Sequence, residues 1–328
     1  MKFDDTRETY SKVATLFYIG GQSHVEIAKM FDISRFKVAR VLKRCRDLNI
    51  IEFRINSKPC YYENMEAEIE KLLKIKKCII VGAGTTEDDS KKNVGKVAAK
   101  YLTTSLKKGM MVGFDWGSTL QTMVSDFSPA SKYDDCMFIQ ISGSIASQSL
   151  EDHGFIDGNE IVKNLAERAG ANWSLFPVPY IVKEKILRDM LMEEKSIKSH
   201  ISNFDKLDMA FFGVGSSHTD AYLSFYKSFL QPAECITLEN EDNTDTGDLL
   251  SCRLDMEGNV KESLLTGRVM TIDLNTLKHV PETVALAAGE NKVISLIASA
   301  RGGYIKTLII TEIVAMSIIN YFENCGTG

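Results

Sequence analysis

The sequence predicts an α/β protein with two parts, a small helical N-terminal domain and a larger domain built on a largely parallel β-sheet. The first sixty residues contain three short segments whose apolar residues recur at helical spacing. From residue 77 onward short apolar runs alternate with helical segments, which is typical of a parallel sheet covered by helices on both faces. The length of 328 residues fits one small and one large domain.

Charge is divided unevenly along the chain. The net charge is −5, yet residues 1–60 hold twelve Lys and Arg against seven Asp and Glu, a charge of +5 that leaves −10 for the remainder. A basic N-terminal segment followed by an acidic remainder is typical of a nucleic-acid-binding module attached to another kind of domain. Hydrophobic residues make up 44% of the chain, which is ordinary for a soluble protein with a sizeable core.

Several protein classes are disfavoured by simple patterns. No apolar run approaches the ~18–20 residues of a membrane helix, and the first ten residues lack the apolar stretch of a signal peptide. We therefore expect a cytoplasmic protein with no membrane partner. The seven cysteines are scattered without a C-x-x-C pair, so we expect neither a disulfide framework nor a metal site.

Two helices are predicted at the N-terminus. Residues 6–19 carry an apolar stripe and end at Gly20-Gly21. Ser23 and Glu26 form a capping box, in which each side chain accepts a hydrogen bond from an otherwise unpaired backbone amide at the start of the second helix. The buried side of this helix is expected to hold Val25, Ile27, Ala28 and Met30.

A third helix completes a helix-turn-helix motif. Residues 31–33 are a turn of the right length, and Ser34 caps the next helix. One face of that helix is apolar, formed by Val38, Val41, Leu42, Cys45 and Leu48. The opposite face of the helix is basic. This arrangement allows the basic face to enter a DNA groove while the apolar face packs on the rest of the domain. A basic amphipathic surface helix is the alternative. The residues expected to contact double-stranded DNA are Ser34, Arg35, Phe36, Lys37, Arg40, Lys43 and Arg44.

The segment between the two domains offers two elements. Residues 50–55 alternate partly like a strand and predict a small wing, with Arg54 and Lys58 near the DNA backbone. Residues 61–75 predict an amphipathic helix that either serves oligomerisation or packs on its own domain. We therefore place the winged-helix-like domain at 1–58, a linker or oligomerisation helix at 59–76 and the large domain at 77–328.

The large domain is predicted from a run of alternating elements. The expected strands are 78–81, 110–114, 137–141, 209–212, 283–287 and 308–310, and the expected helices are 93–106, 118–125, 159–169, 292–300 and 312–321. Ligands of such sheets bind at the carboxyl ends of the strands. Three strand-end loops, 113–119, 213–217 and 288–292, carry Gly with Ser, Thr or Lys, which suits a small anionic ligand such as a phosphate.

The motifs together resemble the SorC/DeoR (sorbitol-operon regulator) family of sugar-binding transcriptional regulators. The matching N-terminal segments are 18–23, 26–28, 33–35 and 38–42, and the C-terminal ones are 116–119, 213–216, 247–249, 255–258, 288–292 and 301–304. The resemblance implies a Rossmann-like effector domain related to sugar-phosphate isomerases and deaminases. It also implies a phosphorylated sugar or polyol effector and a homotetramer assembled as a dimer of dimers.

The resemblance also implies an effector site. The residues that it assigns to effector or phosphate binding are Trp116, Gly117, Ser118, Thr119, Gln140, Asp248, Asp255, Gly289, Asn291 and Lys292. Some relatives bind an aldehyde effector through a lysine where this chain has Ser142, so a Schiff base is not expected at this site. The acidic stretch 239–245 and the segment 252–254 also depart from the family pattern.

The predicted function is that of a transcriptional regulator of a carbohydrate or polyol catabolic operon, controlled by the effector through a population shift. The alternative is a sugar-phosphate isomerase or deaminase with an added DNA-binding head, in which Asp115, Asp248 or Glu290 could act as a base. None of the five histidines lies in the three strand-end loops. We therefore expect no enzymatic activity, no catalytic residues and no cofactor.

Overall fold

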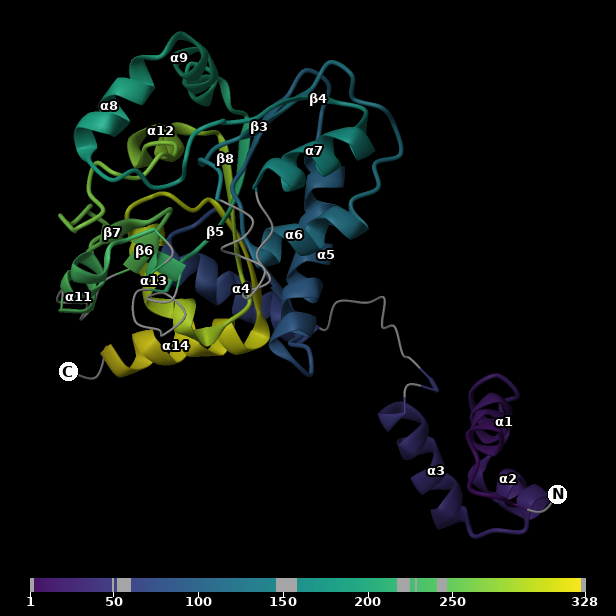
Figure 1. The fold of residues 1–328 in the computed structure, drawn as a ribbon. Helices are drawn as coiled ribbons and strands as arrows, with labels where there is room; N and C mark the ends of the chain where they lie inside the picture. The colour runs from purple at the N-terminus through teal and green to yellow at the C-terminus, as the bar shows by residue number, and fades with distance from the viewer. Residues whose placement is uncertain are drawn as a thin grey trace. The chain divides into compact units, whose positions relative to one another are not determined.

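The computed structural model describes residues 3–48, 50–51, 60–145, 158–216, 225–227, 229–240 and 247–325. The chain divides into two compact units, Met1–Pro59 and Cys60–Gly328 (Figure 1). No helix in the described part of the chain combines the length and the apolar composition that a membrane span requires.

The small unit consists of three helices, α1 (Arg7–Tyr18), α2 (His24–Phe31) and α3 (Arg35–Asp47). Each begins behind a capping side chain, Thr6, Ser23 or Ser34, and the capping box between Ser23 and Glu26 is formed. The core of the unit consists of Tyr10, Val13, Ala14, Ile27, Ala28, Phe31, Val38, Val41, Leu42 and Cys45. Helices of this length are held mainly by such packing rather than by their own propensity.

Three apolar residues lie outside this core, contrary to expectation. Val25 and Met30 are 50% and 47% exposed, because each lies roughly 110° around α2 from the centre of the buried stripe that Ile27, Ala28 and Phe31 form. Phe31, expected in the turn, ends α2 instead. Leu48 is 40% exposed because it is the C-cap of α3 and no longer follows the helical stripe.

The connecting segment is only partly described. Ile50 and Ile51 belong to no strand, and residues 52–59, with Arg54 and Lys58, lie outside the described residues. The amphipathic helix α4 (Cys60–Leu73) lies within the large unit, where it packs against β1 (Lys77–Val81) and α14 (Glu312–Cys325). Met65, Ile69 and Leu73 are buried there, so its apolar stripe is covered by its own unit.

The large unit is built on a seven-stranded sheet in which every neighbouring pair is parallel. The strand order is β1-β9-β8-β5-β2-β3-β4. The strands are β1 (Lys77–Val81), β2 (Met111–Phe114), β3 (Met137–Gln140), β4 (Asn172–Ser174), β5 (Met209–Gly213), β8 (Glu282–Ala287) and β9 (Thr307–Thr311). The predicted fold class is therefore confirmed, and the short edge strand β4 is the one member of the sheet that the pattern did not predict.

Helices cover both faces of the sheet. One face carries α5 (Glu87–Ser105), α6 (Ser118–Asp126) and α7 (Gly158–Ala169), and the other carries α4, α13 (Val293–Arg301) and α14 (Glu312–Cys325) (Figure 1). The helix predicted from residue 93 begins six residues earlier, behind the cap Thr86. The remaining elements are α8 (Lys185–Glu193), α9 (Lys195–Ile201), η2 (Phe204–Lys206), α11 (Pro232–Asn240), α12 (Leu274–His279), η3 (Glu290–Lys292) and a hairpin of β6 (Gly247–Leu249) and β7 (Cys252–Leu254).

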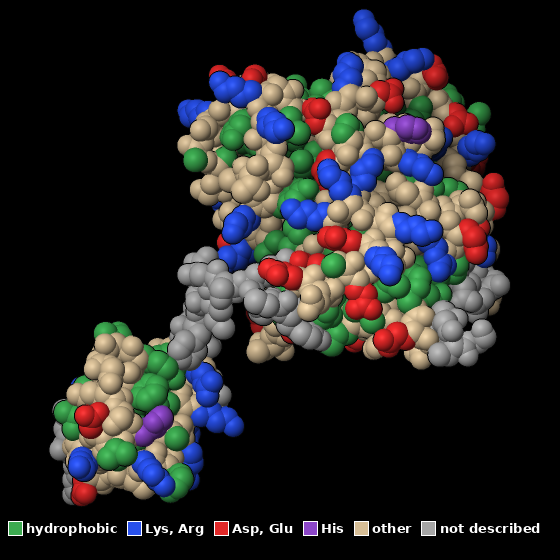
Figure 2. Space-filling model, turned by 180° about the vertical axis from the view of Figure 1, so that it is seen from behind, with side chains coloured by type: hydrophobic (Ala, Val, Ile, Leu, Met, Phe, Trp, Pro, Cys, Tyr) green, Lys and Arg blue, Asp and Glu red, His purple; other side chains and the backbone are tan. Residues whose placement is uncertain are grey.

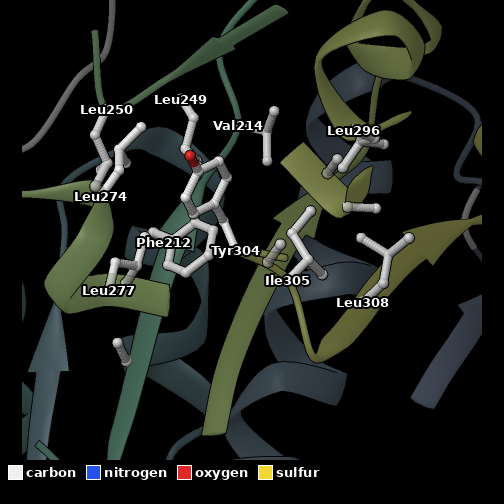
Figure 3. Packing of buried hydrophobic residues seen from close by; sticks show 14 of the residues in the cluster. Phe212, Val214, Leu249, Leu250, Leu274, Leu277, Leu296, Tyr304, Ile305 and Leu308 are labelled. Atoms are coloured by element: carbon white, nitrogen blue, oxygen red, sulfur yellow. The ribbon is translucent and has the colours of Figure 1, made fainter. Parts of the chain in front are cut away.

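The strands send alternate side chains into two apolar layers. In β5, Met209 and Phe211 join the layer under α5, α6 and α7, whereas Ala210 and Phe212 join the opposite layer. Figure 3 shows Phe212 of that second layer beside Tyr304, with side chains from α12, α13 and β9 around them. Strands buried on both faces must be apolar almost throughout, which explains why they were predictable as short apolar runs.

The strand order places a topological switch point between β2 and β5, near the centre of the sheet. The neighbours β2 and β5 are the point where the connections diverge, because β3 and β4 extend the sheet on one side and β8, β9 and β1 extend it on the other. Loops that leave two such strands in opposite directions leave a crevice at their carboxyl ends. This crevice is where a ligand site is expected.

The contact between α5 and α6 depends on a glycine. A Cβ at Gly95 would lie 1.9 Å from Thr122 Oγ1 and 2.8 Å from the Met123 backbone nitrogen. We predict that Gly95→Ala lowers the free energy of unfolding by about 2 kcal/mol, because the overpacking outweighs the gain in helix propensity. Chemical denaturation would measure the loss, with Lys96→Ala at the neighbouring exposed position as the control. A variant as stable as the wild type would show that α6 can move away at little cost.

Candidate functional site

A cavity of about 550 Å³ lies at the crevice between β2 and β5. Its walls come from seven segments of the chain, around residues 87–91, 115–120, 180, 213–216, 225–226, 248–251 and 286–292. The described lining residues that are polar or aromatic are Glu87, Lys91, Asp115, Trp116, Ser118, Thr119, Tyr180, Ser216, Phe225, Tyr226, Asp248, Ser251, Asn291 and Lys292. The volume is in the range of small-molecule sites.

The amino terminus of α6 faces this cavity. Its N-cap is Gly117, whose φ of 139° suits glycine and which has no side chain to cap the helix. Gly117, Ser118 and Thr119 line the cavity. The first-turn amides of an uncapped helix and the positive end of its dipole form a site for an anion, and the two hydroxyls add further donors.

The segment that leads into α13 meets the same cavity through Gly289, Asn291 and Lys292. The short helix η3 begins after Gly289 without a side-chain cap and leads directly into α13, which also lacks one. Lys292, at this junction, is half-buried and donates from Nζ to the carbonyl oxygen of Val214. Burial lowers the pKa of Lys292, and the carboxylate of Asp248 opposes that effect. Lys292 therefore places a cationic side chain on the same lining as the start of α6.

The α5 helix contributes an ion pair at the cavity. Lys91 and Glu87 line it and are 2.7 Å apart, nitrogen to oxygen. The two residues lie one turn apart on the helix, and the hydrogen bond from Lys91 lowers the pKa of Glu87. Lys91 is therefore a second cation within reach of an anionic ligand.

Two buried carboxyl groups also face the cavity. Asp115 follows β2 and is 5% exposed, and Asp248 of β6 is 4% exposed. Asp115 Oδ1 and Asp248 Oδ2 are buried and have no hydrogen-bond partner among the described residues. Burial raises the pKa of both groups to about 7. Buried polar atoms in a cavity without protein partners are atoms that a ligand can satisfy.

The hairpin that holds Asp248 is fixed closely against β5. The amide of Gly215 donates to the carbonyl oxygen of Asp248 at 3.1 Å, and the amide of Asp248 donates to Ser295 Oγ at 2.9 Å. A Cβ at Gly215 would lie 2.0 Å from Asp248 Oδ1. Glycine at position 215 therefore allows the carboxyl group to stand directly over the end of β5.

An aromatic wall closes one side of the cavity. The Trp116 ring stacks on Phe225 and meets the Tyr180 ring edge-on, with centroid distances of 5.1 Å in both cases. The hydroxyls of Tyr180 and Tyr226 both hydrogen-bond to Ser251 Oγ, at 2.6 and 2.5 Å. Rigid aromatic faces beside polar groups suit the apolar faces and the hydroxyls of a carbohydrate-like ligand.

The structure brings most of the predicted effector residues together. Trp116, Gly117, Ser118, Thr119, Asp248, Gly289, Asn291 and Lys292 all line the cavity. Gln140 does not. It is fully buried at the end of β3, where its Oε1 accepts from the Phe176 amide at 3.0 Å.

Asp255 is placed differently from its expected role. Its Oδ1 accepts from the amides of Glu257 and Asn259 at 3.0 and 2.8 Å, and it does not line the cavity. The carboxylate therefore organises its own turn after β7. Ser142, at the position where relatives carry a lysine, hydrogen-bonds to Thr271 Oγ1 at 3.0 Å and also to Asp115.

Several cavity residues were not predicted from the sequence. Lys91, Tyr180, Phe225 and Ser251 belong to segments without a strand-end motif, and only the fold brings them to the cavity. Asp115 was considered only as a base in the enzyme alternative. Its position directly after β2, inside the first strand-end loop, was a signal that could have included it in the site.

The buried carboxyl groups make stability depend on pH. A carboxyl with a pKa near 7 in the fold and 3.8 when unfolded binds more protons in the folded state between these values, so it destabilises the fold as pH rises. We predict that Asp115→Asn gains stability relative to the wild type between pH 5 and pH 8, by on the order of 2 kcal/mol. Denaturation of both proteins at the two pH values measures this. The depressed pKa of buried His200 acts oppositely but is common to both proteins. An equal difference at both pH values would contradict the prediction.

The basic face of α3 is the second candidate surface. Arg35, Arg40, Lys43 and Arg44 are exposed, and none of them forms an ion pair among the described residues. Phe36 is 67% exposed, with the Arg35 guanidinium 5.0 Å from its ring centre. Figure 2 shows Lys and Arg side chains spread along one edge of the small unit.

The other predicted DNA-contact residues have partly local roles. Ser34 is exposed and accepts from the Lys37 amide at 3.2 Å, which is the cap of α3. The Lys37 ammonium lies 4.1 Å from the Phe3 ring centre. Both residues stand at the amino-terminal end of α3, which in helix-turn-helix proteins is the end that meets base edges.

Among the described residues, no group of three or more His, Cys, Asp or Glu side chains could hold a metal ion. The described cysteines 45, 78, 136, 235 and 252 are free thiols.

Comparison with known proteins places this architecture among relatives. The family model described as "Putative sugar-binding domain" matches residues 61–320. The sorbitol operon regulator of Klebsiella pneumoniae is 24% identical over 94% of this chain and 96% of its own, and the deoxyribonucleoside regulator of Bacillus subtilis is 23% identical over the same shares.

Solved structures show the same fold. The full-length sorbitol operon regulator SorC from Klebsiella pneumoniae superposes with a TM-score of 0.69 at 23% identity, over 94% of this chain and 97% of that one. The sugar-binding domain of a transcriptional repressor from Vibrio fischeri gives a TM-score of 0.70 at 22% identity, over 80% of this chain and all of that one. The resemblance inferred from the motifs is confirmed, and the chain belongs to the sugar-binding-domain family of the SorC type.

Proposed function

We propose that this protein is a DNA-binding transcriptional regulator of a carbohydrate or polyol catabolic operon, controlled by a phosphorylated sugar or polyol that binds in the large unit. The observation that carries the effector class is the cavity at the β2–β5 crevice. The uncapped start of α6 and Lys292 supply an anion site on its lining. The aromatic wall and the two buried carboxyl groups supply surfaces for a polyhydroxylated body.

The DNA-binding role is supported by the small unit. A capped three-helix unit presents α3 with an apolar face in the core and an exposed basic face. Arg and Lys on such a helix neutralise phosphates, and residues near its amino terminus read bases in the major groove. The names of the relatives, which describe regulators, point the same way.

The proposed mechanism is a population shift. The effector favours one arrangement of the large units in a homo-oligomer, by proposal a tetramer built as a dimer of dimers, and that arrangement sets the spacing of the DNA-binding units. Reciprocity requires that operator DNA change the effector affinity by the same factor. The protein acts on double-stranded operator DNA in the cytoplasm.

A two-step experiment tests the proposal. DNA that binds the full-length protein is first selected from a random pool, and its affinity is then measured with increasing concentrations of a panel of phosphorylated sugars and polyols. At least one compound should change the DNA affinity by about fivefold or more, the lower range of measured allosteric couplings. If the protein selects no DNA, or if no phosphorylated compound binds or alters DNA affinity, the proposal fails.

A second candidate function has one observation in its favour. Two cavity carboxyl groups with pKa values of about 7 are suited to proton transfer near neutrality, as an isomerase or deaminase would need. Glu290, the third residue considered as a base, is exposed and accepts from Ser317 Oγ at 2.7 Å. Turnover of any member of the panel, lost in Asp115→Asn, would establish the enzyme function instead.

A further inference from the structure

The two buried carboxyl groups of the cavity differ in their charged surroundings. Asp248 stands opposite Arg253 in the register of the β6–β7 hairpin, and both Arg253 and Lys292 favour its carboxylate form. No Lys or Arg among the described residues acts on Asp115 in this way. Its carboxyl interacts with the Ser142 hydroxyl, the Trp116 backbone and the like charge of Asp248. The described residues therefore balance the charge of Asp248 and not that of Asp115.

Asp115 is nevertheless positioned to meet a ligand. It lies at the carboxyl end of β2, lines the cavity, and has 5% of its surface exposed. Its Oδ1 has no hydrogen-bond partner among the described residues. A buried carboxylate without a nearby cation is costly, and a ligand hydroxyl would donate a hydrogen bond to it without balancing the charge. A ligand ammonium group would do both.

We propose that the effector carries an ammonium group in addition to its phosphate, and that Asp115 is the carboxylate that receives it. This inference rests on the proposed function, because it assigns the second end of the same ligand. The phosphate lies at the start of α6 with Lys292, and the ammonium group lies at Asp115 at the end of β2. The ligand class is a phosphorylated amino sugar or amino polyol.

A bound cation is the competing occupant of a carboxylate pair. Among the described residues no third Asp, Glu, His or Cys joins the pair in a group that could hold a metal ion. Glu87, which also lines the cavity, is paired with Lys91. Ca²⁺ takes six to eight oxygen ligands, which is more than the pair supplies. Mg²⁺ is bound by one or two carboxylates together with a ligand phosphate and water, and it would favour the amino and hydroxyl members of the ligand pairs below alike. An ammonium group needs only a few acceptors, which Asp115 Oδ1 and the neighbouring Asp248 Oδ2 can provide.

Matched ligand pairs test the assignment with the full-length protein. Calorimetric titration at pH 7 compares glucosamine 6-phosphate with glucose 6-phosphate, and 1-amino-1-deoxyglucitol 6-phosphate with glucitol 6-phosphate. We expect the amino member of at least one pair to bind about tenfold tighter or more, since a charge-assisted contact replaces a neutral one. Asp115→Asn should remove that preference. Asp255→Asn, which alters a carboxylate outside the cavity, should keep it.

Two results would overturn the inference. One is that the amino members bind no tighter than their hydroxyl partners in the wild type, a comparison that does not depend on any variant folding correctly. The other is a preference that survives in Asp115→Asn. Titration with inorganic phosphate and with the hydroxyl compounds separates this failure from failure of the proposed function. If those bind in a Lys292-dependent way, the phosphorylated effector stands and only the ammonium assignment falls; if no phosphorylated compound binds, both fall.

Discussion

Replacing Lys292 with methionine is expected to lower the affinity of the protein for its phosphorylated effector by about a hundredfold, the upper range for losing a charged hydrogen-bond donor. Lys292 is half-buried, occupies the N-cap position of α13 and lines the cavity together with the start of α6. Methionine keeps the length and apolar stem of the side chain and removes only the ammonium group. The amides at the start of α6 would remain, but the Lys292 charge that pairs with the phosphate would be lost.

Inorganic phosphate and the phosphorylated sugar panel provide the measurement, by calorimetric titration and by thermal stabilisation. Lys100→Met, at an exposed position of α5 outside the cavity, is the matched control and should bind as the wild type does. DNA binding without effector should be unchanged in Lys292→Met, because the small unit is untouched. Wild-type phosphate affinity in Lys292→Met would remove Lys292 from the site.

The fold was largely predictable because its main signals are local. Strands buried on both faces, such as β5 and β9, are short apolar runs, and the caps Ser23 and Ser34 mark where α2 and α3 begin. Elements without such signals were missed. The edge strand β4 reads Asn-Trp-Ser and has no apolar run, and the β6–β7 hairpin has strands of three residues each. Neither element has enough residues to show the apolar run or the alternation of apolar and polar residues that predicts a strand.

The cavity was predictable only where it follows a strand. Trp116 to Thr119 and Gly289 to Lys292 lie at the carboxyl ends of β2 and β8, where the topology requires ligand-binding loops. Lys91 and Tyr180 reach the cavity through the packing of α5 and through an irregular segment, which no local pattern reveals. Asp255 was instead assigned to the effector site by its motif, although the structure places it outside the cavity. Its motif matched the family, yet its carboxylate is used by its own turn.

Replacing Arg40 with alanine is expected to reduce affinity for the selected operator by about tenfold to a hundredfold and to relax the sequence preference at one base position. Arg40 is exposed on α3, on the side opposite Val38, Val41 and Leu42 of the core, and has no ion-pair partner among the described residues. Alanine favours the helix, so the small unit should keep its structure. Effector binding should not change.

Comparison with Lys43→Ala distinguishes base reading from phosphate contact. Lys43 lies further along α3 and is also exposed, so its loss should weaken binding to all sequences alike and reduce the dependence of affinity on salt by about one phosphate contact. Lys12→Ala on α1, where the ammonium group pairs with Glu8 at 2.7 Å, is the control and should bind as the wild type does. Affinity measured at several salt concentrations on selected and mismatched DNA separates the three variants. If Arg40→Ala binds both DNAs as tightly as the wild type, α3 does not place this residue in the groove, and the side chains nearer its amino terminus, Arg35 and Phe36, become the remaining candidates for base reading.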